Sequence, residues 1–319
     1  MTGAQVDEAK TDRSFRLAVA VVVVANLGAA VQARLNAGLG QRLGNGFAGG
    51  LISTTIALVV LGAVVLSRPT GRAALSRIRE GVGEGRLRWC QCLGGVSGGL
   101  FLASQGLAVP TIGVAVFTVA VVAGTTTGSV LVDGLGLGPS GRHPITAPRI
   151  AGAVLAVTAV AVAGRGGPGA GGFSVLVLLP LVAGMALSWQ LAVNGRVSEV
   201  AGSPWAATLV NFSFASAALA VALGVNVAVG GWPRGNAPTE PWFYTGGFIG
   251  VLLIAVAAAV VRRTGVLVLG LASVAGQLTG AVFVDLLAPG AHSAPGAATW
   301  AGVALTFAAV TLATLSRRE

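Results

Sequence analysis

Charged side chains are scarce in this sequence. Only 9% of the 319 residues are Asp, Glu, Lys or Arg, whereas 54% are hydrophobic. A soluble domain carries charge on about a quarter of its residues, because its surface must be solvated. Here the charges lie in short stretches between apolar runs, and each run is close to the roughly 20 residues that a helix needs to cross a bilayer. The scarcity of charge excludes a soluble globular fold and predicts an all-α integral membrane protein.

Cysteine and histidine are almost missing, which bears on metal binding and catalysis. Cys90 and Cys92 form one C-x-C pair at the start of an apolar run, and no histidine lies near them. A structural zinc site usually needs four ligands. His143 and His292 both lie in connections rich in Pro and Gly. We therefore expect no metal, no cofactor and no catalytic residues, and the sequence disfavours an integral membrane enzyme.

Acidic residues are few, and none is expected in the interior of a membrane span. The ten are Asp7, Glu8, Asp12, Glu80, Glu84, Asp133, Glu199, Glu240, Asp285 and Glu319. Proton-coupled carriers generally keep a carboxylate or a histidine within the membrane. The lack of one disfavours exchange of a cation for protons at a central carboxylate. It favours export or facilitated diffusion of a neutral or zwitterionic solute.

The net charge of +10 does not indicate nucleic-acid binding. The basic residues flank apolar runs and do not alternate with aromatic residues, which is typical of the cytoplasmic ends of membrane helices. Six arginines lie within residues 67–88. Two interpretations of this segment remain open: it binds anionic lipid head groups, or it is a solvated loop that obeys the topology rule.

Ten transmembrane helices are predicted from the apolar runs between charged or Gly/Pro-rich breaks. The predicted spans are 16–36, 46–66, 88–108, 112–132, 147–164, 173–194, 204–229, 242–261, 264–286 and 297–315. The leader before the first run contains Asp7, Glu8 and Asp12, unlike the basic leader of a cleaved signal peptide. We therefore interpret residues 1–15 as a cytoplasmic tail and the first run as a retained helix.

The two sets of five spans are related in sequence. Residues 109–133 align without a gap to residues 261–285, with about half of the positions identical. The turn and helix start at 44–53 likewise match 202–211. Internal similarity of this kind indicates a duplicated unit. The sequence predicts a first repeat over residues 16–164, a Gly-rich linker over 165–172 and a second repeat over 173–319.

An odd number of spans per repeat requires the second copy to be inverted in the membrane. With the N-terminus and C-terminus in the cytoplasm, sixteen Lys and Arg residues fall on the inner side and four on the outer side, as the positive-inside rule requires. The copies also diverge as inversion predicts. Pro110-Thr111 is uncharged, but its counterpart is Arg262-Arg263.

Three motifs resemble a known family. They are the Gln-x-x-x-Asn of Gln32 and Asn36, repeated at Gln190 and Asn194; the Gly/Asn/Pro turns; and the Gly-x-x-x-Gly helices that end at Asp133 and Asp285. Together they resemble the YdcZ-like family of the bacterial drug/metabolite transporter superfamily. Its members are commonly single five-span units, and this chain is similar to a fused ten-span form. The resemblance implies a secondary carrier or exporter in the bacterial plasma (inner) membrane.

Candidate substrate-binding residues are polar side chains inside the predicted spans, since such residues usually face a bundle interior or a cavity. Amide side chains can donate and accept hydrogen bonds without carrying charge. The predicted set is Gln32, Asn36, Gln190, Asn194, Asn211, Gln277, Ser53 and Trp189. An alternative interpretation is that the amides bond across helices and hold the bundle together, and that Trp189 is an interfacial or packing residue.

The Gly-x-x-x-Gly pairs, Gly124/Gly128 and Gly276/Gly280, predict close helix packing between the halves. Altogether the sequence favours a transporter that moves a small polar or amphiphilic metabolite or drug by alternating access, through a cavity lined by the first four helices of each half. The alternative is a non-transporting scaffold or lipid-handling protein. The expected partners are the substrate and the bilayer, and the protein is expected to be a monomer or a homodimer.

Overall fold

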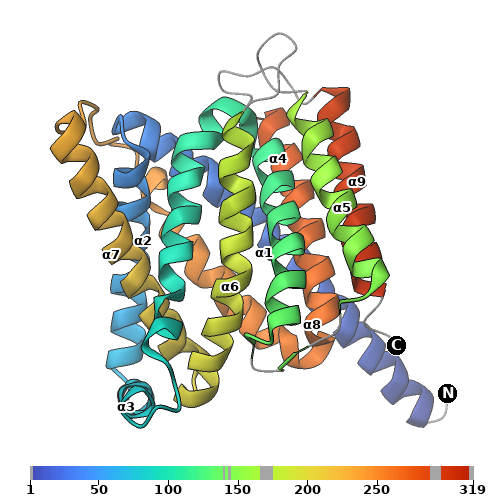
Figure 1. Cartoon of the computed structure of the whole chain (residues 1–319). Coiled ribbons are helices and arrows are strands. Elements are labelled where there is room, and N and C mark those ends of the chain that lie inside the picture. The colour runs from blue at the N-terminus through green and yellow to red at the C-terminus, as the bar shows by residue number, and fades with distance from the viewer. Residues whose placement is uncertain (1–2, 139–140, 143–144, 166–174, 288–295, 316–319) are drawn as a thin grey trace.

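The computed structural model describes residues 3–138, 141–142, 145–165, 175–287 and 296–315, apart from the side chains of 3–15, 254–255, 257–271 and 313–315. In this part of the chain, every regular element is a helix (Figure 1). The elements are α1 (Gly3–Arg42), α2 (Gly46–Leu66), α3 (Pro69–Gly83), η1 (Trp89–Leu93), α4 (Gly94–Leu135), α5 (Ala147–Gly164), η2 (Val175–Val177), α6 (Leu178–Ala201), α7 (Pro204–Gly230), η3 (Pro241–Tyr244), α8 (Gly246–Leu287) and α9 (Ala297–Leu315). His143, His292 and most of the predicted linker lie outside the described residues.

Six helical segments of the described residues are long and apolar enough to cross a membrane. They are Arg16–Arg42, Gly46–Leu66, Trp89–Leu135, Ala147–Gly164, Val175–Ala201 and Pro204–Gly230. Ala272–Leu287 and Ala297–Leu312 are shorter apolar helices. This composition and length agree with a multi-pass membrane protein.

The longest of these segments contains two limbs that run in opposite directions. Within α4, the backbone of Gly113 is not helical, with φ 79° and ψ 166°. Glycine adopts this conformation at little cost because it has no Cβ. Before this break, Gly94 and Gly98 pack against Asn194 and Gln190 of α6, so that the two helices are antiparallel.

After the break, α4 runs parallel to α6. Gly124 packs against Leu181, and Gly128 packs against Met185. The chain therefore reverses at Gly113, close to the boundary predicted between the third and fourth spans.

The same reversal occurs in α8, measured against α1. Gly246 and Gly250 pack against Asn36 and Gln32, whereas Gly276 packs against Val23. Because Gly280 packs against Leu27, α8 is antiparallel to α1 at its start and parallel to it near its end. The second long helix thus corresponds to the predicted eighth and ninth spans.

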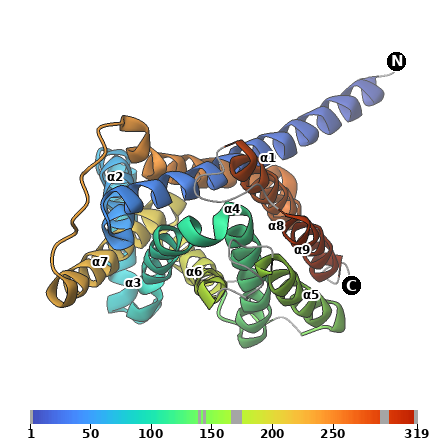
Figure 2. The same cartoon turned by 90° about the horizontal axis from the view of Figure 1, so that it is seen from above.

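Two further helix pairs flank this centre. α2 packs on α7 at one edge of the molecule and α5 packs on α9 at the other, as seen from above (Figure 2). α2 and α7 are antiparallel, because Asn45 at the start of α2 bonds to Asn226 near the end of α7. The main apolar core lies between these edges and is formed by α4 together with the facing sides of α1, α5, α8 and α9.

Residues 67–88, predicted only as a connection, contain the amphipathic helix α3. Pro69 stands at its first turn, where a missing N–H is tolerated. Ala74 and Ile78 are buried in a cluster with Val197 and Ala201 of α6, so that α3 lies across the end of the bundle (Figure 1). This apolar face was not recognised in the sequence because six arginines dominate the segment's composition.

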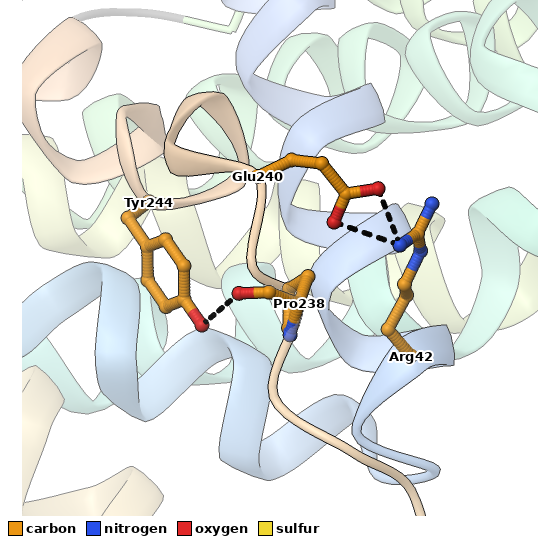
Figure 3. A network of polar contacts seen from close by, with 4 residues as sticks. All are labelled: Arg42, Pro238, Glu240 and Tyr244. Atoms are coloured by element: carbon orange, nitrogen blue, oxygen red, sulfur yellow. Dashed lines mark hydrogen bonds and ion pairs between the residues drawn. The ribbon is translucent and has the colours of Figure 1, made fainter.

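A strap of residues 231–245 covers the end of α1 between α7 and α8. Gly235 donates from its backbone N–H to the carbonyl of Leu43 at 3.2 Å. Arg42 Nη1 donates to both carboxylate oxygens of Glu240, at 2.7 and 2.9 Å, and the Tyr244 hydroxyl donates to the carbonyl of Pro238 (Figure 3). The bonds from Gly235 and Arg42 hold the strap against the end of α1, and the Tyr244 bond joins two residues of the strap itself.

Candidate substrate site

A small cavity lies in the interior of the molecule, between α1, α4 and α8. Its volume is about 30 Å³, which is room for one or two water molecules. Its lining residues are Ala29, Ala30, Ala33, Phe101, Gln105, Phe117, Thr118, Val121 and Gln277. Because α8 belongs to the second half of the chain and the other two helices to the first, the cavity lies between the halves.

One polar side chain of the cavity, Gln105, comes from the first limb of α4 and is only 1% exposed. Its Oε1 accepts a 2.6 Å hydrogen bond from Nδ2 of Asn36, which is also 1% exposed. Among the described residues, its Nε2 has no hydrogen-bond acceptor. Asn36 therefore holds the Gln105 carboxamide by its oxygen and leaves its donor unpaired.

The opposite side of the cavity carries Gln277, from the end of α8. Its Nε2 donates to Oδ1 of Asn26 at 3.1 Å. Asn26 is fixed in turn, because its Nδ2 donates to the carbonyl of Val22 at 2.9 Å and to the Ser273 hydroxyl at 3.3 Å. This arrangement leaves the Oε1 of Gln277 as an acceptor without a partner among the described residues.

The remaining described walls are apolar except for the Thr118 hydroxyl. The rings of Phe101 and Phe117 lie 5.9 Å apart between centroids, tilted by 44°. The Thr118 hydroxyl donates to the Val114 carbonyl, one turn earlier, at 2.8 Å, and keeps its acceptor capacity. Of the residues whose side chains are described, none that lines the cavity is charged. The site can therefore hydrogen-bond a polar molecule without neutralising a charge.

The remaining predicted polar residues form two separate groups. The first amide cluster, Gln32, Asn36 and Ser53, packs against the glycines that begin α8. The second amide cluster, Gln190, Asn194 and Asn211, packs against the glycines that begin α4. In the second cluster, Asn194 Nδ2 donates to Asn211 Oδ1 at 3.1 Å.

The two amide clusters lie far apart. Asn36 contacts α4 at Gln105 and Asn194 contacts it at Gly94, which is eleven positions or roughly 16 Å of helix. The structure thus does not bring the eight predicted residues into one site. Gln277 lines the cavity and Asn36 supports it, while Gln32, Ser53 and the second cluster do not line it. Trp189 is partly exposed and lies outside the cavity lining as well.

Each amide cluster contains one buried oxygen without a hydrogen-bond partner in the described part of the chain. These atoms are Oδ1 of Asn36 and Oε1 of Gln190. An unpaired buried acceptor costs about 1–3 kcal/mol. Both atoms lie against a helical glycine, Gly246 in the first cluster and Gly98 in the second. In each cluster, close helix packing has therefore been kept at the expense of one hydrogen bond, although the atoms concerned stand at different positions of the repeated motif.

Comparison with known proteins identifies the family to which the chain belongs. A family model described as "Putative inner membrane exporter, YdcZ" matches residues 17–162 and 175–312. The chain belongs to this family. The match covers two repeats and confirms the resemblance found in the sequence.

Membership of this family carries general consequences. The protein is a multi-pass protein of the bacterial inner membrane, and its family is one of exporters, hence of transporters and not of enzymes. No functionally curated protein matches the chain. A solved structure titled "Crystal structure of protein" shares 18% identity with a TM-score of 0.55, over 96% of this chain and 98% of that one, and supports the fold alone.

Proposed function

We propose that the protein is a secondary transporter that exports, or equilibrates, a small polar or amphiphilic metabolite or drug by alternating access. The observation that carries this proposal is the small cavity between the two halves, in whose mostly apolar lining stand the amide side chains Gln105 and Gln277. A carrier of this type binds its substrate near the midplane, at the interface of its repeats, and opens to one side at a time. A non-transporting scaffold has no need of a buried polar cavity.

The proposal includes ten spans in two inverted repeats, over residues 16–164 and 173–319, joined by a linker at 165–172 and preceded by a tail at 1–15. Equivalent contacts support it. Gly98 packs on Gln190 as Gly250 packs on Gln32. The antiparallel course of α2 and α7 supports inversion, and the reversals within α4 and α8 support five spans per repeat.

Alternating access also needs interfaces that can exchange two packings. The two most extensive helix interfaces of the described residues are those of α4 with α6 and of α1 with α8. Each of them joins one half of the chain to the other. Glycines line both interfaces, with Gly124 against Leu181 and Gly276 against Val23. Smooth backbone contacts of this kind allow helices to lie close together, and we propose that these two interfaces move when the cavity opens.

Transport is tested with purified protein in proteoliposomes and a panel of neutral, zwitterionic and cationic solutes. Flux of at least one solute class above that of protein-free vesicles is expected. The Gln32→Ala/Gln190→Ala variant tests the amide clusters, and Gln41→Ala, at an exposed position of α1, is its matched control. Lack of flux for every class would contradict the transporter proposal and favour the scaffold or lipid-handling alternative.

The topology is tested by labelling single cysteines after replacement of Cys90 and Cys92. A membrane-impermeant maleimide should label Thr239→Cys in intact cells and Ser76→Cys only after lysis, because the two exposed sites are proposed to lie on opposite faces. Labelling of both from the same side would contradict the inverted ten-span topology. The bilayer and the substrate are the proposed partners, with the protein as monomer or homodimer.

A further inference from the structure

The central cavity presents an unusual combination of polar groups, which bears on what it binds. Gln105 offers an unpaired donor, Nε2, and Gln277 offers an unpaired acceptor, Oε1, among the described residues. Each glutamine is held at its other atom by an asparagine of α1: Asn36 binds Gln105, and Asn26 binds Gln277. Asn26, which is itself held by Val22 and Ser273, fixes which atom of Gln277 is left for a ligand, and Asn36 bonds Gln105 through its oxygen.

We infer that the cavity is a recognition site for an uncharged carboxamide-like group on a small, apolar or aromatic body. An amide carbonyl would accept from Gln105 Nε2, and the amide N–H would donate to Gln277 Oε1. A carboxylate has no donor for Gln277, and an amidinium has no acceptor for Gln105. The inference rests on the proposed function, because it names the substrate class of the same cavity.

Discrimination between these groups follows from burial. A site built around paired hydrogen-bonding groups rejects a ligand that leaves one of them unpaired, because the unpaired group has lost water without compensation. An ionic ligand would in addition lose hydration in a cavity where no charged side chain can compensate it. The apolar part of the ligand would contact Phe101 and Phe117, whose rings form one wall.

The cavity has a volume of only about 30 Å³ and must widen to admit more than the amide group. α1 presents only the methyl side chains of Ala29, Ala30 and Ala33 to it. Separation of α1 from α4 would therefore enlarge the cavity without displacing a bulky side chain of α1. Asn26 and Asn36 flank these alanines on α1, so they act as positioning residues that move with this wall.

The test uses benzamide, benzoate and benzamidinium, which share one shape and differ in charge and hydrogen-bonding groups. Binding to the purified wild-type protein in nanodiscs is measured by titration calorimetry and by the shift in thermal unfolding midpoint, at constant ionic strength. Benzamide is expected to bind at least tenfold more tightly than either ion. Equal or tighter binding of an ion, or no binding of benzamide, would overturn the inference.

The decisive variant is Gln105→Glu. It keeps an oxygen for Asn36 to donate to and, at a pH high enough to ionise a buried carboxyl, replaces the free donor by an acceptor. The unfolding midpoint of the variant checks that it is folded. Benzamide affinity should fall at least tenfold and benzamidinium affinity should rise. Gln41→Glu, at an exposed position on α1, is the matched control and should leave both affinities unchanged. Retained preference for benzamide in Gln105→Glu would overturn the inference.

The positioning residues need their own readout. Asn36→Leu should reduce the ratio of benzamide to benzamidinium affinity severalfold, because the Gln105 carboxamide can then rotate, and Asn36→Gln should restore part of the ratio. An unchanged ratio in Asn36→Leu would contradict the positioning role. The binding test is independent of flux. Selective benzamide binding without transport of any solute would contradict the transporter proposal alone. Transport of another solute without benzamide binding would contradict this inference alone.

Discussion

Asn36 of α1 donates a 2.6 Å hydrogen bond to Gln105 of α4, with each side chain only 1% exposed. In an apolar bundle, such a bond links two helices and fixes the direction in which each amide points. The same residue packs against the first glycine of α8. Asn36 thereby joins the three helices that surround the cavity.

Removal of this amide should destabilise the protein. Asn36→Leu leaves the Gln105 oxygen buried without a partner, at an expected cost of about 1–3 kcal/mol. The unfolding free energy in mild detergent, measured by thermal or denaturant titration, checks this value. The control is Asn226→Ala, which removes an amide–amide hydrogen bond to Asn45 at an exposed position. This change should lower the unfolding free energy by less than about 0.5 kcal/mol. Equal losses of unfolding free energy in the two variants would contradict the expectation that burial strengthens the contribution of the Asn36–Gln105 bond.

Much of the helix pattern could be predicted from the sequence, because membrane spans are set by apolar length and charge. The spacing of four in the repeated Gln-x-x-x-Asn motifs places each amide pair on one helical face. In the structure, Gln32 and Asn36 both contact α8, and Gln190 and Asn194 both contact α4. The glycine pairs were expected to pack between halves, and Gly124 and Gly276 do so.

The cavity itself could not be predicted from the repeated motifs. The counterpart of Gln277 is Thr125, and in the same register that of Gln105 is Ala257. Asn26, the partner of Gln277, has Gly184 as its counterpart. A search for polar residues shared by both halves therefore finds the clusters near the helix starts and passes over the residues around the cavity, where the halves have diverged.

A second prediction concerns the interface between α4 and α6. A Cβ at Gly124 would overlap the carbonyl oxygen of Leu181, so Gly124→Ala must push the two helices apart. We expect destabilisation by about 1–3 kcal/mol, measured as the loss of unfolding free energy. Gly62→Ala, where no atom lies within 4 Å of the added Cβ, is the matched control and should stabilise by up to about 1 kcal/mol. A neutral Gly124→Ala would contradict the close approach of these helices.

A third prediction concerns the break in α4. Asp285 accepts hydrogen bonds from the backbone N–H groups of Val114 and Ala115, at 3.0 and 2.7 Å. These groups follow Gly113 and have no partner within their own helix. Asp285→Ala should therefore cost about 1–2 kcal/mol of unfolding free energy, as the loss of other helix caps does. Asp285→Asn keeps one acceptor oxygen and should cost less. A ranking in which Asn is the worse replacement would count against the capping role.

The last prediction concerns the strap and its pH dependence. The pKa of Glu240 is lowered by a hydrogen bond from its own backbone and by the bond from Arg42, whose guanidinium also lies 4.8 Å from the centre of the Phe243 ring. Because the folded-state pKa is below the unfolded value, the carboxylate stabilises the fold above the usual value of 4.5, and this stabilisation is lost as the pH falls through the lowered pKa.

Comparison of the wild-type protein with Glu240→Gln isolates this contribution. The wild-type unfolding midpoint should exceed that of the variant at pH 7, and the difference should shrink below pH 4.5. High salt should also reduce it, since both side chains are partly exposed, at 48% for Arg42 and 28% for Glu240. Arg42→Lys retains the charge but loses the planar guanidinium that lies over the Phe243 ring, and should give an intermediate midpoint. A difference between wild type and Glu240→Gln that persists unchanged to pH 3 would contradict the assignment of this stabilisation to the ionised carboxylate of Glu240.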